Sequence, residues 1–303
     1  MADYHVLDLY FRGYPAAIAA FAIPHERGVI LVESGPGSTL PALACGLERL
    51  GYRLEDVTDV LLTHIHLDHA GAAGALARRG ARIHVHPVGA PHMVHPERLL
   101  KSARRLYQDE MDLLWGDFLP VPEEQVVIPE DGKPFTLYGH TFVALDTPGH
   151  ASHHYAYLWN GEVLFTGDVA GVRLPGARHV RLPTPPPEFH LETWRASVRK
   201  LLDASARQWV LTHFGPVDDP EWHGQRLLAV LDDLAALLED LMSREPDAET
   251  LTQALLEWTW KIGQEDGLTR EQHEQYELVN PTWMSALGVQ RYWRKFRAHP
   301  EGP

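Results

Sequence analysis

The amino-acid sequence contains a dense group of metal-ligand residues at positions 64–69, which read HIHLDH. Three histidines and one aspartate occupy four of these six positions, and imidazole and carboxylate groups suit zinc, iron and manganese. The group follows the apolar segment 57–62, which predicts a buried strand ending in a loop. Because a loop can turn neighbouring side chains towards one point and a straight strand cannot, we interpret positions 64–69 as the start of a metal site.

Three more residues of ligand type follow short apolar segments further along the chain. His150 ends the sequence DTPGH, Asp168 ends FTGD, and His213 lies within LTHFG. In each case a predicted strand delivers one ligand at its end, close to a glycine that permits a tight turn. A solvated group of surface histidines would explain positions 64–69 alone, but it does not explain this repetition. The four segments together indicate one metal site built from strand ends.

These motifs resemble those of the metallo-β-lactamase superfamily and occur in the same order along the chain. The resemblance runs from about residue 18 to residue 215. It is strongest to the hydroxyacylglutathione hydrolase and lactonase branches. The resemblance implies an α/β (α+β) fold, a four-layer αββα sandwich that holds its metals at the common edge of two sheets. Glu33 stands where the family usually has an aspartate, at a buried position that supports the site.

The resemblance also implies two metal ions, each with three ligands of its own and one carboxylate shared between them. The ligands of the first ion are His64, His66 and His150. The ligands of the second ion are Asp68, His69 and His213, and Asp168 bridges the two ions. Zinc is the expected metal, with iron and manganese as alternatives. We expect His154 to orient a ligand or line the site from behind, and the other histidines near these motifs to be structural or exposed.

Two metal ions that share one oxygen lower the pKa of bound water enough to give hydroxide near neutrality. We therefore expect a metal-bridging hydroxide to attack a small ester, thioester or lactone, with Asp68 as the catalytic residue that aims it. No GxSxG serine motif competes with this mechanism. The acid that protonates the leaving group stays open among four candidates, Tyr107, Tyr155, His179 and His190.

The loop after Asp168 is rich in arginine and predicts contact with an anionic substrate. Arg173, Arg178 and Arg181 are expected near the metals, and we single out Arg173 and Arg181 as substrate-binding residues. The alternative is that these arginines form ion pairs with the excess carboxylates of the protein itself. Residue types alone leave the two interpretations equally open.

Three other functions fit parts of the same pattern. A sulfur dioxygenase with one iron keeps the HIHLDH motif, although the complete second ligand set disfavours it. A phosphodiesterase acting on nucleic acids is disfavoured by the absence of a long insertion between Asp168 and His213. A binding protein merely stabilised by metal ranks last, because structural sites rarely use a bridging carboxylate.

Length and composition set the remaining expectations. The 303 residues predict a catalytic domain over 1–220 and a helical C-terminal appendage over 221–303, where strand patterns cease. The net charge of −14 disfavours nucleic acid as a partner, and a small, anionic molecule remains acceptable because the metals are positive. No targeting or membrane-spanning segment stands out, so a cytoplasmic location without membrane contact is expected. The sequence leaves a homo-oligomer open.

Few asparagines and a high share of arginine and proline fit a thermophile or a GC-rich genome. The single cysteine, Cys45, lies in an apolar helical segment, so we expect it to be buried and structural.

Overall fold

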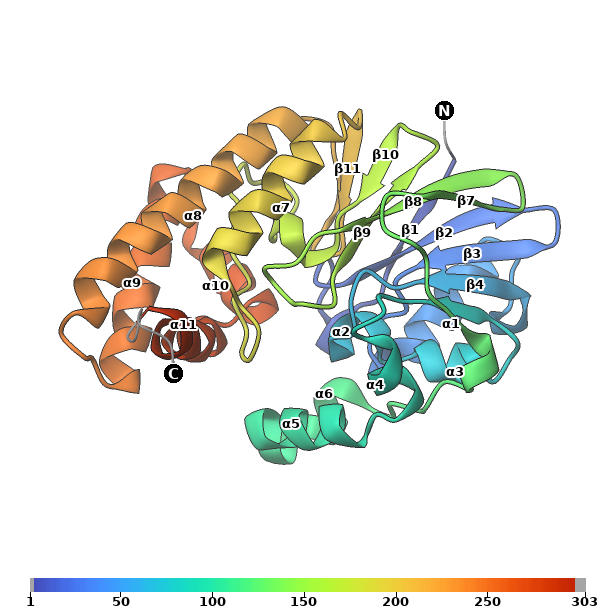
Figure 1. Ribbon diagram of the computed structural model, residues 1–303, viewed down its shortest axis with the longest axis horizontal. Coiled ribbons are helices and arrows are strands. Elements are labelled where there is room, and N and C mark those ends of the chain that lie inside the picture. The colour runs from blue at the N-terminus through green and yellow to red at the C-terminus, as the bar shows by residue number, and fades with distance from the viewer. Residues whose placement is uncertain (1–2, 298–303) are drawn as a thin grey trace.

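The computed structural model describes residues 3–297, so the outer ends of the two predicted domains, 1–2 and 298–303, lie outside the described residues. Within the described part, two sheets of six strands each face one another, with helices against their outer surfaces (Figure 1). This is the four-layer αββα sandwich that the sequence predicted, so the predicted fold class is confirmed.

The first sheet is built from the N-terminal part of the chain, with its strands in sequence order. The strands are β1 (His5–Asp8), β2 (Ala19–His25), β3 (Gly28–Val32), β4 (Val57–Leu61), β5 (Arg82–His84) and β6 (Val126–Val127). Strands β3 to β6 are parallel, which brings their C-terminal ends to one edge of the sheet.

The second sheet has the order β12-β11-β10-β9-β8-β7. Its strands are β7 (Pro134–Leu137), β8 (His140–Asp146), β9 (Tyr155–Trp159), β10 (Val163–Phe165), β11 (Gln208–Leu211) and β12 (Gly215–Val217). Strands β10 and β11 are parallel, so the residues that follow them emerge side by side.

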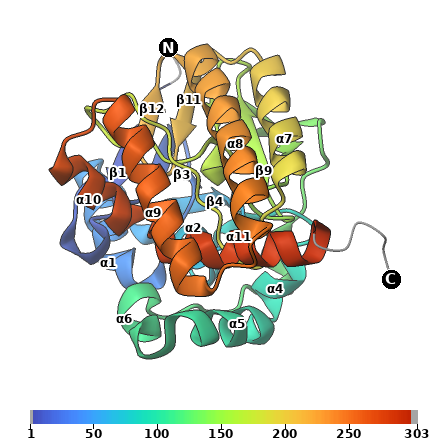
Figure 2. The same cartoon turned by 90° about the vertical axis from the view of Figure 1, so that its left-hand side faces the viewer.

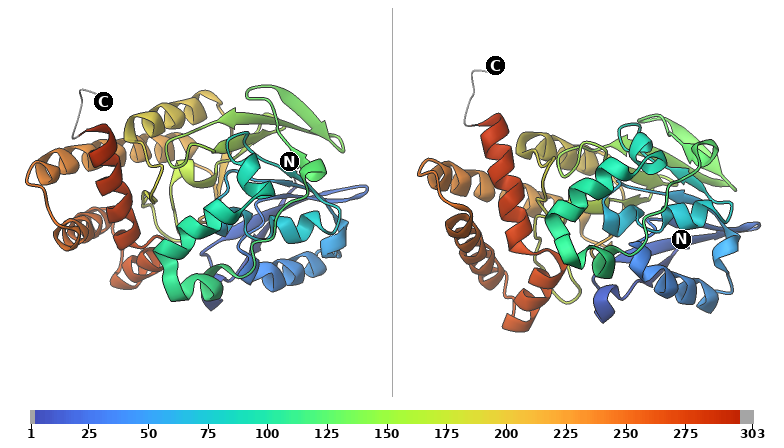
Figure 3. Two further views of the ribbon diagram at one scale, coloured as in Figure 1. Left: turned by 60° about the horizontal axis from the view of Figure 1, so that its bottom comes forward. Right: turned by 90° about the horizontal axis from the view of Figure 1, so that it is seen from below.

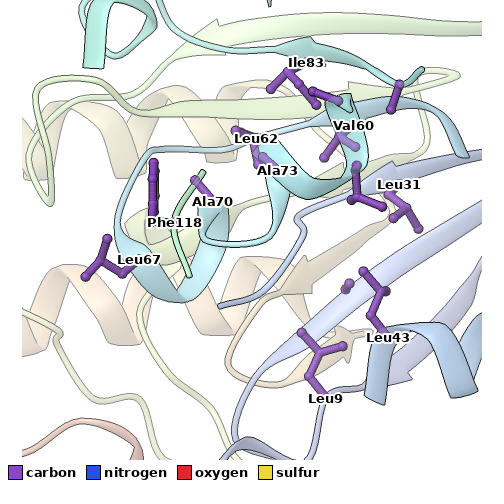
Figure 4. Close-up of a cluster of buried hydrophobic side chains, with 14 of the residues drawn as sticks. Leu9, Leu31, Leu43, Val60, Leu62, Leu67, Ala70, Ala73, Ile83 and Phe118 are labelled. Carbon is purple, nitrogen blue, oxygen red and sulfur yellow. The ribbon is translucent and has the colours of Figure 1, made fainter. Parts of the chain in front are cut away.

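Side-chain alternation along β3 explains how the layers form. Val29 and Leu31 point into the core under the outer helices, whereas Ile30 and Val32 point into the core between the two sheets. Because both faces of the strand are buried, its sequence is continuously apolar rather than alternating. Figure 4 shows part of the outer core, where Leu31 and Val60 from neighbouring strands lie near Leu43.

The helices over the first sheet and beside its edge come from the N-terminal half. They are α1 (Leu40–Arg49), α2 (Leu67–Ala70), α3 (Ala73–Ala77), α4 (Ala90–Val94), α5 (Glu97–Tyr107) and α6 (Met111–Trp115). The prediction that Cys45 is buried is wrong, because the side chain is exposed. Helix α1 buries Leu43 and Leu47, one turn apart, and residue 45 falls between them on the opposite side of the helix.

The remaining helices follow the second sheet. They are α7 (Leu191–Asp203), α8 (Pro220–Met242), α9 (Ala248–Glu265), α10 (Arg270–Val279) and α11 (Thr282–Phe296). Helices α8 and α7 lie side by side, and α11 crosses below them (Figure 2). Leu227 and Leu231 of α8 share one hydrophobic core with Trp194 of α7 and Trp209 of β11.

Helix α8 thus begins within one residue of the predicted domain boundary. Its buried side chains, however, belong to the same hydrophobic core as those of α7 and β11. The division into two domains stays a prediction. None of the helices in the described residues is long and apolar enough to cross a membrane.

Candidate metal centre

In the segment after β4, the apolar side chains are buried in the core and the polar side chains face the candidate metal site. Ile65 and Leu67 are buried in the outer core, and Figure 4 shows Leu67 beside Phe118. His66 is the residue that precedes the single turn of α2, and Asp68 and His69 lie within that turn. The alternation of apolar and polar residues therefore fixes the backbone on one side and turns the ligand side chains to the other.

Three histidines from two of these segments form the first ligand group. His66 Nδ1 lies 2.9 Å from His64 Nε2 and 2.9 Å from His150 Nε2. One ligand atom from each of the three lies within 4.8 Å of the others, which is the spacing expected of ligands around one ion. His64 and His150 are buried, whereas His66 is half-buried.

Asp68, His69 and His213 form the second group, whose ligand atoms also lie within 4.8 Å of one another. The Asp68 Oδ2 atom is 3.5 Å from His69 Nε2 and 3.4 Å from His213 Nε2. Asp68 is half-buried, so each of the two groups has one member that reaches solvent. The site is therefore open on the side of His66 and Asp68.

Asp168 lies between the two groups. Its Oδ1 atom is 3.3 Å from His69 Nε2 and 3.4 Å from His213 Nε2, and its Oδ2 atom is 3.4 Å from His150 Nε2. One carboxylate thus reaches members of both groups with different oxygen atoms. The structure brings together all seven residues that the sequence nominated as metal ligands.

Two atoms in this cluster test whether a cation fits. His69 Nε2 and Asp168 Oδ1 are buried and lie 3.3 Å apart, yet neither makes a hydrogen bond of acceptable geometry, to the other or to any other described residue. Such atoms are rare in folded proteins, because leaving a buried polar atom unpaired costs roughly 1–3 kcal/mol. A cation would bind both atoms at once, and the nitrogen and oxygen donors around it suit zinc, iron or manganese. The residues present therefore fit a metal.

The protonation states of the first ligand group and of Asp168 suit metal binding directly. Burial, reinforced by the neighbouring histidines, lowers the pKa of His64 and of His66 well below the ordinary value, so both imidazoles are neutral at pH 7. Burial acts to raise the pKa of Asp168, but His69, His213 and His150 outweigh it and lower that pKa. Neutral imidazole and ionised carboxylate are the forms that coordinate metals. In His69 and His213 burial acts to lower the pKa, but the carboxylates of Asp68 and Asp168 outweigh it and raise that pKa, so a metal ion would displace a proton from each.

A shell of hydrogen bonds fixes the imidazole rings from behind. His150 Nδ1 donates to the Pro183 carbonyl oxygen (2.9 Å), and His213 Nδ1 donates to the Ala17 carbonyl oxygen (2.7 Å). His69 Nδ1 donates to Glu33 Oε1 at 2.9 Å. In each ring the Nε2 atom is left to face the cluster, which is the arrangement that orients histidine ligands.

Glu33 is fully buried directly after β3 and has a left-handed backbone conformation, with φ at 66°. Besides His69, its carboxylate accepts hydrogen bonds from the hydroxyls of Thr63 (2.5 Å) and Thr212 (3.1 Å). Glu33 therefore joins the two ligand-carrying segments that follow β4 and β11.

His154 lies behind the first group. Its ring stacks on that of His64 with centroids 5.0 Å apart, and its Nδ1 atom is 2.9 Å from the Thr147 hydroxyl. A Cβ atom on Gly167 would lie 2.7 Å from His154 Nε2, so the glycine before Asp168 allows this close approach. His154 thus lies directly behind the first group, and its role in orienting a ligand stays a prediction.

The two arginines nominated as substrate-binding residues face carboxylates of the protein itself. Arg173 donates to both oxygens of Asp219, and its guanidinium also lies over the ring of Trp222. Arg181 is buried and contacts Glu277 together with Thr282. These contacts match the ion-pair alternative, and substrate binding by Arg173 and Arg181 stays a prediction.

Of the four candidates for the leaving-group acid, three have partners elsewhere. The Tyr155 hydroxyl donates to the Pro129 carbonyl, His179 pairs with Asp266, and His190 accepts from the Thr193 amide at the start of α7. Within residues 3–297, the Tyr107 hydroxyl donates only to Met284 Sδ, at 3.6 Å. Burial and, to a smaller extent, the charge of Asp68 raise the pKa of Tyr107, so this hydroxyl feels the charge of the second ligand group.

Comparison with known proteins supports this geometry. The family model described as the metallo-beta-lactamase superfamily matches residues 13–213, which contain every residue of the cluster. A solved structure of a metallo-beta-lactamase family protein from Thermus thermophilus covers 97% of this chain and 94% of its own, with a TM-score of 0.70 and 23% identity.

Relatives with curated names share parts of the chain. A metallo-beta-lactamase fold-containing protein of Sulfurisphaera tokodaii is 25% identical over 67% of this chain and 75% of its own length. An atrochrysone carboxyl ACP thioesterase of Aspergillus fumigatus is 33% identical over 37% of this chain and 27% of its own. A hydroxyacylglutathione hydrolase of Actinobacillus pleuropneumoniae is 27% identical over 49% of this chain and 48% of its own, so the chain spans half or less of these last two.

The family match covers well over half of the chain, and its range contains every segment that builds the cluster. The protein therefore belongs to the metallo-beta-lactamase superfamily, whose members are metal-dependent hydrolases.

Proposed function

We propose that the protein hydrolyses thioesters at a centre of two divalent metal ions, with zinc as the expected metal. The observation that carries the proposal is the position of Asp168, whose two oxygens reach one ligand group each. A carboxylate placed in this way suits two neighbouring ions rather than one. Two relatives named for thioester hydrolysis support the choice of thioesters over other esters and lactones.

Within this proposal, His64, His66 and His150 hold one ion, Asp68, His69 and His213 hold the other, and Asp168 joins them. When bound, the two ions would supply a water molecule of lowered pKa and neutralise negative charge on the carbonyl oxygen. The oxygen of water bonds to the carbonyl carbon, the carbon–sulfur bond breaks, and the departing thiolate takes up a proton.

The chain's own residues orient and restrict this reaction. Asp68 is half-buried on the open side of the cluster, where its second oxygen can accept a hydrogen bond from the attacking water. Tyr107 stays protonated because its pKa is raised, so its hydroxyl can donate to the substrate at the same side. The buried histidines exclude water from the rest of the cluster.

The proposal is tested by elemental analysis combined with a substrate panel. We expect about two metal equivalents per chain and turnover of acyl thioesters faster than of matched oxygen esters, lactones and phosphodiesters. A single iron with oxygen consumption on a persulfide would overturn the proposal in favour of a sulfur dioxygenase. Preference for a phosphodiester would overturn it in favour of a phosphodiesterase.

A further inference from the structure

The charge of this chain is distributed unevenly. Helix α5 carries four basic residues and one acidic residue, and α11 carries three basic residues and no acidic residue. The two helices therefore have a combined net charge of +6 within a chain whose net charge is −14. The remainder of the protein is correspondingly more acidic than the total suggests.

The basic side chains of both helices reach solvent. The exposed cations are Arg98, Lys101, Arg104 and Arg105 on α5 and Arg291, Arg294 and Lys295 on α11. Among the described residues, only Arg104 of these seven has a carboxylate within 4.0 Å, the exposed Asp112. Arg291, Arg294 and Lys295 line one surface hollow along α11. Asp109 and Glu110 are exposed just after α5, so the basic surface covers the body of that helix rather than its end.

Side-chain and backbone contacts link both helices to the metal centre. Tyr107, the last residue of α5, contacts Met284 near the start of α11 and lies in reach of the Asp68 charge. Helix α11 in turn packs on the loop next to Pro183, whose carbonyl holds His150. Seen from below, α5 and α11 lie side by side at the surface (Figure 3).

Exposed apolar side chains accompany the basic ones. Leu113 of α6 is 72% exposed, and Trp283 at the start of α11 is 42% exposed. Large apolar groups next to a charged surface are typical of sites where another protein docks.

We propose that α5 and α11 form a docking surface for a small acidic carrier protein that bears the acyl group as a thioester. The proposal rests on the proposed thioester hydrolysis and names the form in which the substrate arrives. A carrier holds its thioester at the end of a flexible arm, so it docks beside the reacting atoms rather than on them. Docking on α5 and α11 brings the arm to the side of the centre that His66 and Asp68 leave open.

The spread of the cations favours a protein over a small anion. From Arg98 to Arg105 the helix extends about 10 Å, and its four cations are exposed along this whole length rather than gathered in one buried site. An extended polyanion such as duplex DNA, or an anionic membrane, would also meet the acidic remainder of the molecule and be repelled. A small acidic protein can cover the two helices alone. One relative is named an ACP thioesterase, which agrees with this form of substrate.

The test compares one acyl group on two carriers. The metal-loaded full chain is assayed with an octanoyl group on a bacterial acyl carrier protein and on N-acetylcysteamine. We expect the triple variant Arg98→Glu, Lys101→Glu, Arg105→Glu to raise KM for the carrier-bound substrate about tenfold and leave kcat/KM for the small thioester unchanged. Arg294→Glu with Lys295→Glu should act in the same direction. The matched control replaces by glutamate three exposed arginines outside both helices, Arg49, Arg78 and Arg207. It should change the kinetic constants for neither substrate.

Binding of the carrier without an acyl group is measured separately, by fluorescence anisotropy at about 50 and 300 mM salt. Affinity should fall with salt in the parent protein and depend less on salt in the triple variant. Unchanged carrier affinity in the triple variant, an equal loss in the control, or tighter binding to anionic vesicles or duplex DNA than to the carrier would overturn the docking surface. If the parent protein binds the carrier but hydrolyses neither thioester, the proposed function fails and the docking surface stands.

Discussion

Glu33 shows how much of the site depends on one residue that need not touch a metal. Its carboxylate accepts hydrogen bonds from Thr63 and His69, which follow β4, and from Thr212, which follows β11. Its left-handed backbone costs of order 1 kcal/mol for a residue of this kind, so the surrounding hydrogen bonds must hold it in place.

We expect Glu33→Gln to weaken metal binding about 10–100-fold, because the amide replaces a charged acceptor of the His69 ring with a neutral group. Titration of the metal-free protein with zinc against a competing chelator measures this loss. Glu33→Asp keeps the charge and tolerates a positive φ better, so its loss should be smaller. Equal losses in the two variants would contradict the role given to the charge.

Asp168 is the residue on which the number of metal ions depends. Asp168→Asn keeps the shape of the side chain but removes the charge shared by the two groups, so we expect bound metal to fall to about one equivalent or less and kcat/KM to drop at least ~100-fold. Elemental analysis and thioester turnover check these outcomes. Asp146→Asn is the matched control, because this carboxylate also ends a strand but binds His86 outside the cluster. Two metal equivalents in the Asp168 variant would rule out the bridging role.

Sequence reasoning identified the side chains of the cluster but missed the backbone groups that hold them. The ligands have distinctive types and follow apolar segments, so their positions could be predicted one by one. The carbonyl oxygens of Ala17 and Pro183 have no such signature, because every residue carries one, and only the fold brings them to His213 and His150. For Arg181 the carboxylate partner lies 96 positions away, on an element whose placement the sequence does not reveal.

At the scale of elements, strand ends were the reliable part of the prediction. Buried parallel strands are short and apolar, and their boundaries in β3, β4 and β10 follow from that pattern. The helices near the C-terminus could be recognised as helices, but their periodicity did not reveal what they cover. Helix α11 packs so closely on the loop after Pro183 that a Cβ atom on Gly288 would overlap the Thr184 carbonyl oxygen.

Gly288→Ala sets two effects against each other. In an unobstructed helix the change would stabilise by about 0.5–1 kcal/mol, because glycine is a poor helix former. Here the added methyl group would clash with backbone atoms, which cannot move aside by changing rotamer. We therefore expect a net destabilisation of roughly 1–3 kcal/mol and weaker metal binding, because the shifted loop carries Pro183, which holds His150. Thermal unfolding and zinc titration measure both. Gln290→Ala on the same helix is the control, and an alanine at 288 that raises the melting temperature would refute the close packing.

At the scale of the whole molecule, two buried histidines join the C-terminal helices to the rest. His223 of α8 donates to the Ala170 carbonyl, and His179 pairs with Asp266 after α9. Burial lowers the pKa of each to about 4, although Asp266 opposes this shift at His179. Both histidines are therefore neutral in the folded protein at pH 7 and must gain a proton when the chain unfolds in mild acid.

The sign of the pH dependence follows from these two pKa values. Between about pH 6.5 and 4 the unfolded chain binds more protons than the folded one, so this contribution to stability is complete above 6.5 and falls as the pH falls. The loss should reach roughly 2 kcal/mol per histidine at pH 5. Urea unfolding at about pH 7.5 and 5 should show a smaller loss for His223→Gln, which cannot titrate, than for the parent protein or for the exposed control His95→Gln. The same loss of unfolding free energy in the parent protein and both variants would exclude His223 as a cause.

The contact between Gly288 and Thr184 also limits how this protein can be divided or recombined. The family match ends at residue 213, which suggests a self-sufficient module followed by an exchangeable extension. Yet α11 lies beyond that boundary and presses on the loop that positions a predicted metal ligand. A chimera that takes its C-terminal helices from a relative must therefore take the loop 183–187 with them. Diversification of these helices is tied to the metal centre rather than independent of it.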